Sequence, residues 1–163
     1  MRTLDRKFQL FPFLISLFIT LGIGIIASIF TRPEIKGWYI NLSKPSFTPS
    51  NWLFPVAWTI LYVLIATAAY MVWIRRDKSI TYTRASMIYI VQLLLNFSWS
   101  IVFFGMHEIF AALVIIILLL VTIILNIAWF GRFSKTAAWL LVPYVVWVSY
   151  AGLLNLSIYI LNR

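Results

Sequence analysis

The chain has 163 residues, of which 63% are hydrophobic and only 10% carry a charged side chain. Soluble domains carry about 25% charged residues, so 13 basic and 4 acidic side chains could not cover the surface of a soluble fold. The mean hydropathy of +0.98 agrees, and the composition predicts an integral membrane protein. Because the chain has no cysteine, disulfides, thiolate metal sites and cysteine nucleophiles are excluded.

The net charge of +9 would indicate a nucleic-acid partner in a soluble chain. In a membrane protein the basic residues are instead divided between the two sides of the bilayer. We therefore expect membrane lipid, and no nucleic acid, as the surroundings of this chain.

Five uncharged runs are long enough to cross a bilayer as helices. At about 1.5 Å per residue, 20 to 23 residues span roughly 30–35 Å, which matches a hydrocarbon core of about 30 Å. The predicted spans are residues 8–30, 52–74, 85–106, 109–131 and 136–160. We expect an all-α membrane protein, a five-transmembrane-helix bundle that forms a single domain over residues 1–163, with a long loop between its first two helices.

The basic residues are unevenly divided between the two faces of this bundle. The N-terminal tail and the connections after the second and fourth spans share one face, which holds nine of the 13 basic residues. The positive-inside rule then places the N-terminus in the cytoplasm. We expect a multi-pass protein of a bacterial cell membrane in this orientation.

The predicted spans contain no ionisable side chain, since all four acidic residues and the single histidine, His107, lie outside them. Ion-coupled carriers usually need a carboxylate or histidine at depth, and acid–base catalysis needs a positioned titratable pair. The sequence therefore disfavours both classes. No metal site is expected, and we interpret His107 as a solvated loop residue.

The predicted loop, residues 31–51, is rich in proline and aromatic residues. It contains Pro33, Trp38, Tyr39, Pro45, Phe47 and Pro49. Long loops often serve as lids or binding segments. The alternative is an interfacial loop whose aromatic side chains lie among lipid headgroups.

Three tryptophans lie too deep in the spans to be interfacial anchors. Trp58 and Trp99 lie roughly 9–11 Å below the face that carries the long loop, and Trp147 lies somewhat deeper. A buried indole N–H needs a hydrogen-bond acceptor. The three indoles indicate either a cavity for a flat apolar ligand beneath the loop or ordinary aromatic core packing.

The few polar side chains in the spans recur at helical spacing. One stripe consists of Gln92, Asn96, Trp99 and Phe103, and a second of Trp147, Ala151 and Asn155. We expect both stripes to face the bundle interior, either joining helices or contacting a ligand. Pro55 and Pro143 either widen a pocket or kink a helix.

The first span has a small residue at every fourth position. These residues are Ser16, Thr20, Gly24 and Ser28. Such stripes allow close approach of helix backbones. We predict a packing role within or between protomers and no contact with ligand.

Taken together, these motifs resemble the translocator protein family, the TspO/MBR or tryptophan-rich sensory proteins, also known as peripheral benzodiazepine receptors. The matching segments are Trp38-Tyr39, Lys44-Pro45-Ser46-Phe47-Thr48-Pro49, Trp52 to Trp58-x-x-Leu61-Tyr62, Gln92-x-x-x-Asn96-x-x-Trp99, Phe103-Phe104-Gly105, Trp139 to Pro143-Tyr144-x-x-Trp147 and Leu154-Asn155. They cover nearly the whole chain in order.

The resemblance implies a five-helix bundle, often a homodimer, with a cavity beneath the first loop for porphyrins, sterols or benzodiazepine-type drugs. The implied cavity residues are Trp58, Asn96, Trp99, Trp147, Ala151 and Leu154, and to these we add Trp38, Pro45, Phe47, Trp52 and Tyr62 as expected ligand contacts. No cofactor is expected, since protoporphyrin IX or a related tetrapyrrole would be ligand or substrate.

Two positions and the C-terminus depart from the family pattern. Phe47 replaces a loop tryptophan, Ala111 stands where some relatives have a pocket tryptophan, and the C-terminal sterol pattern is loosely kept. The sequence thus favours tetrapyrrole over sterol. We expect a receptor or sensor.

The alternatives are tetrapyrrole or sterol transport, and light- and oxygen-dependent protoporphyrin degradation. In some bacterial relatives the residues that match Trp58 and Trp147 support this degradation, and only in that case would both be catalytic.

Overall fold

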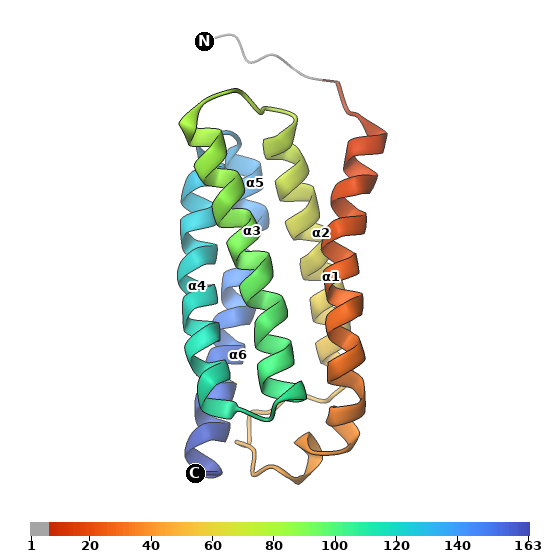
Figure 1. The fold of residues 1–163 in the computed structure, drawn as a ribbon, viewed down its shortest axis with the longest axis vertical. Coiled ribbons are helices and arrows are strands. Elements are labelled where there is room, and N and C mark those ends of the chain that lie inside the picture. The colour runs from red at the N-terminus through yellow and green to blue at the C-terminus, as the bar shows by residue number, and fades with distance from the viewer. Residues whose placement is uncertain (1–6) are drawn as a thin grey trace.

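The computed structural model describes residues 7–163, and within them it contains five membrane-spanning helical segments and no strand (Figure 1). The elements are α1 (Leu10–Lys36), η1 (Tyr39–Asn41), α2 (Leu53–Trp73), α3 (Ile80–Ser100), η2 (Ile101–Gly105), α4 (Ile109–Gly131), α5 (Lys135–Leu140) and α6 (Val142–Leu161). The predicted five-helix bundle is confirmed. Arg2 and Arg6, two of the nine basic residues that the orientation argument counts, lie outside the described residues, as does the acidic residue Asp5.

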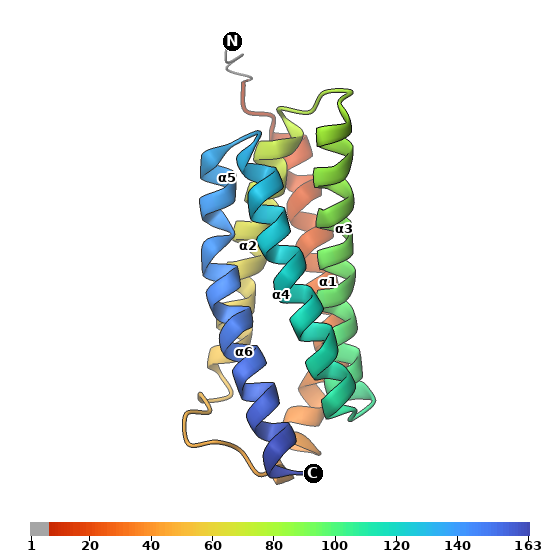
Figure 2. The same ribbon diagram turned by 90° about the vertical axis from the view of Figure 1, so that its left-hand side faces the viewer.

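The helices form a closed ring in which α1 packs on α2 and α3, α4 packs between α3 and α6, and α2 contacts α5 (Figures 1 and 2). The α2–α3 and α4–α5 connections lie at one end, which we call the basic end. The α1–α2 and α3–α4 connections and the end of α6 lie at the other, which we call the loop end. Short connections force this antiparallel order.

Helix α1 is longer than the sequence predicted. It continues past residue 30 through Pro33 and ends at Lys36, where the backbone N–H of Gly37 donates to the carbonyl of Pro33. Charged residues mark the end of the hydrocarbon layer, but they do not end a helix, since water solvates them there. The loop after α1 is therefore shorter than predicted, residues 37–52 in place of 31–51.

Two other boundaries differ from the prediction. Helix α3 begins at Ile80, five residues before the predicted start, because the Ser79 hydroxyl caps it by accepting from the backbone N–H of Tyr82. The last span is two helices, not one. The break lies at Leu141, and Pro143, which has no N–H to donate, occupies the first turn of α6.

Small buried side chains bring the helices close together at several levels of the bundle. Ala66, Ala68, Ala85, Ala112 and Ala137 are fully buried. The Ser16 hydroxyl of α1 donates to the carbonyl of Ala66 in α2 over 2.8 Å. Close approach at these points leaves open space elsewhere, one region near each end of the bundle.

Candidate ligand-binding cavity

A cavity of about 400 Å³ lies in the half of the bundle next to the loop end and is lined mainly by residues of α1, α2, α3, η2 and α6. Six of the predicted ligand contacts line it, namely Trp58, Tyr62, Asn96, Trp99, Ala151 and Leu154. The lining is mostly apolar and aromatic with a few polar groups, which is typical of small-molecule sites.

The π-helical segment η2 places two aromatic rings in this wall. Its wide turn is closed by a hydrogen bond of 2.9 Å from the N–H of Met106 to the carbonyl of Ile101, five residues back. Such a turn rotates the following side chains relative to an α-helix. Consecutive residues Phe103 and Phe104 are consequently both buried and both line the cavity.

A buried hydrogen-bond chain fixes the amide of Asn96. The Tyr62 hydroxyl donates to Asn96 Oδ1 over 2.7 Å, and Asn96 Nδ2 donates to the Tyr144 hydroxyl over 2.9 Å. All three residues are buried. The amide joins α2, α3 and α6, so it serves as interhelical glue and also as part of the cavity wall.

The Trp99 indole is held from the opposite side. Its Nε1–H donates to Asn155 Oδ1 over 3.1 Å, and Asn155 Nδ2 donates to the carbonyl of Ile109. The Trp99 ring is stacked on Phe103 with centroids 5.5 Å apart. Both predicted polar stripes therefore face the interior, as expected.

Two polar groups near the loop end of the cavity make no hydrogen bond within the described residues. Arg32 of α1 lines the cavity and is exposed. The Tyr39 hydroxyl of η1 is buried and has no hydrogen-bond partner among the described residues. Burial, with a smaller contribution from Tyr150, raises the pKa of Tyr39 to about 12, so the hydroxyl remains a neutral donor at physiological pH.

Trp147, in contrast with its predicted place, is not among the residues that line the cavity. Its ring stands behind Trp58, edge to face with centroids 6.5 Å apart, and also contacts Phe54. The buried Nε1 of Trp147 has no hydrogen-bond partner within residues 7–163. Trp58 is thus the inner and Trp147 the outer member of an indole pair.

Four predicted contacts in or next to the loop, Trp38, Pro45, Phe47 and Trp52, are also absent from the lining. Phe47 is half-exposed and its carbonyl accepts from the Tyr150 hydroxyl. Trp52 is 67% exposed. Of the predicted ligand contacts, the structure therefore brings together in the cavity wall the six that lie within α2, α3 and α6. It leaves Trp147 and these four residues outside the lining.

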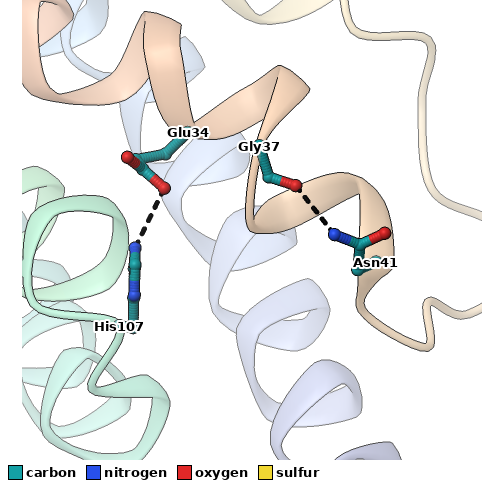
Figure 3. A network of polar contacts seen from close by, with 4 residues as sticks. All are labelled: Glu34, Gly37, Asn41 and His107. Carbon is teal, nitrogen blue, oxygen red and sulfur yellow. Dashed lines mark hydrogen bonds and ion pairs between the residues drawn. The ribbon is translucent and has the colours of Figure 1, made fainter.

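His107 is paired, where the sequence indicated a solvated histidine. Its Nε2 lies 3.0 Å from Glu34 Oε2 (Figure 3), and its ring stacks on Trp38 at 4.4 Å. Beside this pair the Asn41 side chain donates to the carbonyl of Gly37 (Figure 3). The two contacts of His107 join the end of α1 and the start of the following loop to the α3–α4 connection. Because both side chains are partly exposed, the pair adds little stability.

The small-residue stripe of α1 has a wider role than predicted. Thr20 is fully buried against Tyr89, which fits the packing role. Gly24 and Ser28, however, line the cavity. The absence of large side chains on this face of α1 leaves the space that the cavity occupies, so the stripe forms part of the cavity wall as well as a packing surface. The expectation that it makes no contact with ligand stays a prediction.

Sequence reasoning missed several lining residues of α1, including Thr31, Arg32 and Ile35. They continue the face of Leu21, Gly24 and Ser28 at helical spacing. This helical spacing continues past residue 30, where the predicted span ends, and it is the sequence signal that indicates these residues.

Comparison with known proteins identifies the same relatives as the motifs. The TspO/MBR family model matches residues 15–161. "Tryptophan-rich protein TspO" of Archaeoglobus fulgidus is 43% identical over 147 residues, 90% of this chain and 94% of that protein. The protein of the same name from Chlorobaculum tepidum is 41% identical over 146 residues, 87% of this chain and 90% of the relative. Human "Translocator protein" is 31% identical over 139 residues, 82% and 80% of the two chains.

Proposed function

The chain belongs to the TspO/MBR family, and from this premise we propose that it is a membrane receptor or sensor that binds porphyrins and other flat hydrophobic ligands in the cavity beneath its first loop. The observation that carries the proposal is a cavity of about 400 Å³ whose walls are built from Trp58, Trp99, Phe103 and Phe104. Aromatic walls of this kind bury a large area of a flat ring.

Two polar groups in the cavity lining support a tetrapyrrole as the proposed ligand. Protoporphyrin IX combines an apolar macrocycle with two propionate groups. The macrocycle would lie among the aromatic rings, and Arg32 and the Tyr39 hydroxyl at the loop end would meet a propionate. A sterol, which carries one hydroxyl and no carboxylate, would use fewer of these groups.

A titration with protoporphyrin IX in the dark tests the proposal. Several tryptophans lie in or next to the cavity, so tryptophan fluorescence should fall saturably as the ligand binds. The Trp58→Phe variant should lose part of the quenching, whereas Trp139→Phe, which removes a tryptophan that is 72% exposed, should keep the same affinity. Non-saturable quenching that matches detergent micelles alone would reject the proposal.

The indole pair favours one alternative function, light-dependent porphyrin degradation. Trp58 would contact the excited macrocycle, and Trp147, 6.5 Å behind it, is close enough to pass an electron to an oxidised Trp58. Excited porphyrin and oxygen would do the chemistry, and the protein would supply binding and orientation.

We also propose a cytoplasmic N-terminus, because the basic residues of the sequence are divided nine to four between the two faces. A reporter fused after Arg163 should then be outside the cytoplasm, and one inserted at Lys78 inside it. The opposite labelling would reverse the orientation. The homodimer that the family resemblance implies is tested by chemical cross-linking in native membranes.

A further inference from the structure

A second cavity, of about 460 Å³, lies near the basic end of the bundle between α1, α2 and α3. Its lining includes Phe11, Ile15, Tyr70, Trp73, Tyr82 and Tyr89, and it shares no lining residue with the first cavity. Thr20, which is fully buried and hydrogen-bonded to Tyr89, lies on α1 between the two. The two spaces are therefore separate sites.

The second cavity has exposed lining residues on its α1 side. Small side chains on all three helices, Ser16, Ala69 and Ser86, leave the space unfilled. On the α1 side the lining residues Phe11 and Ile15 are 74% and 44% exposed. A flexible apolar chain can thus enter from the side, between α1 and its neighbours.

The rim of this cavity is positively charged. The α2–α3 connection follows the lining residue Trp73 directly and contains the exposed bases Arg75, Arg76 and Lys78. The guanidinium of Arg76 lies 3.7 Å from the centre of the Trp73 ring. The one acidic residue there, Asp77, accepts hydrogen bonds from the backbone N–H and hydroxyl of Ser79.

These bases have no carboxylate partner in the described structure. Within residues 7–163 the only ion pair is Glu34 with His107, at the loop end. Arg75 and Arg76 donate to carbonyls of the preceding helical turn and keep further N–H groups free for an anion. An apolar space with a cationic rim is complementary to a molecule that has an acyl chain and an anionic head.

We propose that this second cavity binds an anionic phospholipid, with one acyl chain between α1 and α3 and the phosphate against Arg76 and Lys78. Basic pockets at the ends of membrane-spanning helices recognise anionic headgroups in this way. The membrane supplies the ligand in excess, and its chain fills a space that would otherwise be empty in the hydrocarbon layer.

Native mass spectrometry of delipidated protein tests the proposal with two lipids that share the same acyl chains. Phosphatidylglycerol should be retained in preference to phosphatidylcholine. Arg76→Gln with Lys78→Gln should reduce that preference at least about fivefold. The matched control is Arg132→Gln with Lys135→Gln. It also removes two positive charges from the basic end, but both lie at the α4–α5 connection and not at the α2–α3 connection beside the cavity, so this variant should keep the preference.

Site mapping separates the cavity from a general attraction of charges. Phosphatidylglycerol with a diazirine on one acyl chain should cross-link to the first turns of α1 and the last turns of α2. Ser86→Phe fills the cavity and should abolish these cross-links. If this variant does not fold, Ala69→Leu makes the same test with a smaller side chain. Protoporphyrin titration of either variant should be unchanged, which keeps the result independent of the proposed function.

Three outcomes would overturn the proposal. Equal retention of both lipids would show that the rim does not select an anion. Cross-links spread evenly around the bundle would show that no cavity site exists. Absence of lipid adducts, together with links between two copies along α1 formed by a separate bifunctional cross-linker, would assign the cavity to a second copy of the chain.

Discussion

Gly24 of α1 lies against the ring of Tyr62 of α2 so closely that a methyl group on Gly24 would overlap the ring. The Tyr62 ring cannot easily retreat, because it is buried and its hydroxyl donates to Asn96. The close packing of α1 against Tyr62 in the wall of the first cavity therefore requires glycine at position 24.

Gly24→Ala should destabilise the protein by about 1–3 kcal/mol, the usual cost of overpacking, and should weaken protoporphyrin binding by displacing Tyr62. Gly22→Ala is the matched control, since an added methyl group there meets nothing within 4 Å. Thermal unfolding in detergent and a porphyrin titration of both variants measure the difference. Equal behaviour of the two variants would contradict the packing described here.

Tyr62→Phe should cost about 1–2 kcal/mol of stability, because it removes the donor to Asn96 Oδ1 and leaves that buried oxygen unpaired. Tyr159→Phe, on a half-buried part of α6, should cost less than about 0.5 kcal/mol. Unfolding midpoints of the two variants compare these costs. A larger loss of stability in Tyr159→Phe than in Tyr62→Phe would show that the hydrogen bonds of Asn96 do not stabilise the bundle as described.

Arg32→Gln should weaken binding of protoporphyrin about two- to fivefold, the range of an exposed ion pair, and should leave its dimethyl ester unaffected. Lys36→Gln removes a charge from the same end of α1 without altering the cavity lining, and it should bind both compounds like wild type. If Arg32→Gln and Lys36→Gln lose affinity for protoporphyrin equally, the loss comes from the lower positive charge of the loop end and not from a contact between Arg32 and a propionate.

Tyr39→Phe should leave the stability of the free protein unchanged or slightly higher, because the hydroxyl that it removes is buried and unpartnered. Its affinity for protoporphyrin should fall if a propionate accepts from this hydroxyl. The pKa of about 12 keeps the group protonated through neutral and mildly alkaline pH, so the difference between Tyr39→Phe and wild type should not change there. If the difference in protoporphyrin affinity between Tyr39→Phe and wild type changes with pH near neutrality, a group other than the Tyr39 hydroxyl binds the propionate.

Illumination in the presence of oxygen distinguishes a binder from an enzyme. If the indole pair is redox-active, wild type converts protoporphyrin to a new absorbing species, and Trp58→Phe and Trp147→Phe bind the porphyrin without converting it. Trp147→Phe should leave affinity almost unchanged, since Trp147 does not line the cavity. Bleaching by wild type no faster than in micelles alone would reject the photo-oxidative alternative and leave the receptor proposal intact.

The number of spans and the inward-facing polar residues were predictable because hydrophobic length and helical spacing are local properties of the sequence. Asn96 and Asn155 illustrate this, since an amide in a hydrocarbon layer has to face other helices. The end of α1 was not predictable from charge alone, because Arg32 and Lys36 continue the helix beyond the apolar layer.

The place of Trp147 behind Trp58, and the absence of the loop aromatics from the cavity lining, depend on how distant segments pack. The His107–Glu34 pair joins residues 73 positions apart, and no local pattern indicates it. These features follow from tertiary contacts rather than from periodicity.

The central claim is that the ligand occupies the cavity bounded by α1, α2, α3 and α6, and filling that cavity tests it most directly. Ala151 is buried in the cavity wall, whereas Val146 of the same helix is 65% exposed. Protoporphyrin affinity should fall at least about tenfold in Ala151→Phe, or in Ala151→Leu if the larger ring prevents folding, and should be unchanged in Val146→Phe. A folded Ala151→Phe protein that binds protoporphyrin with wild-type affinity would contradict the account.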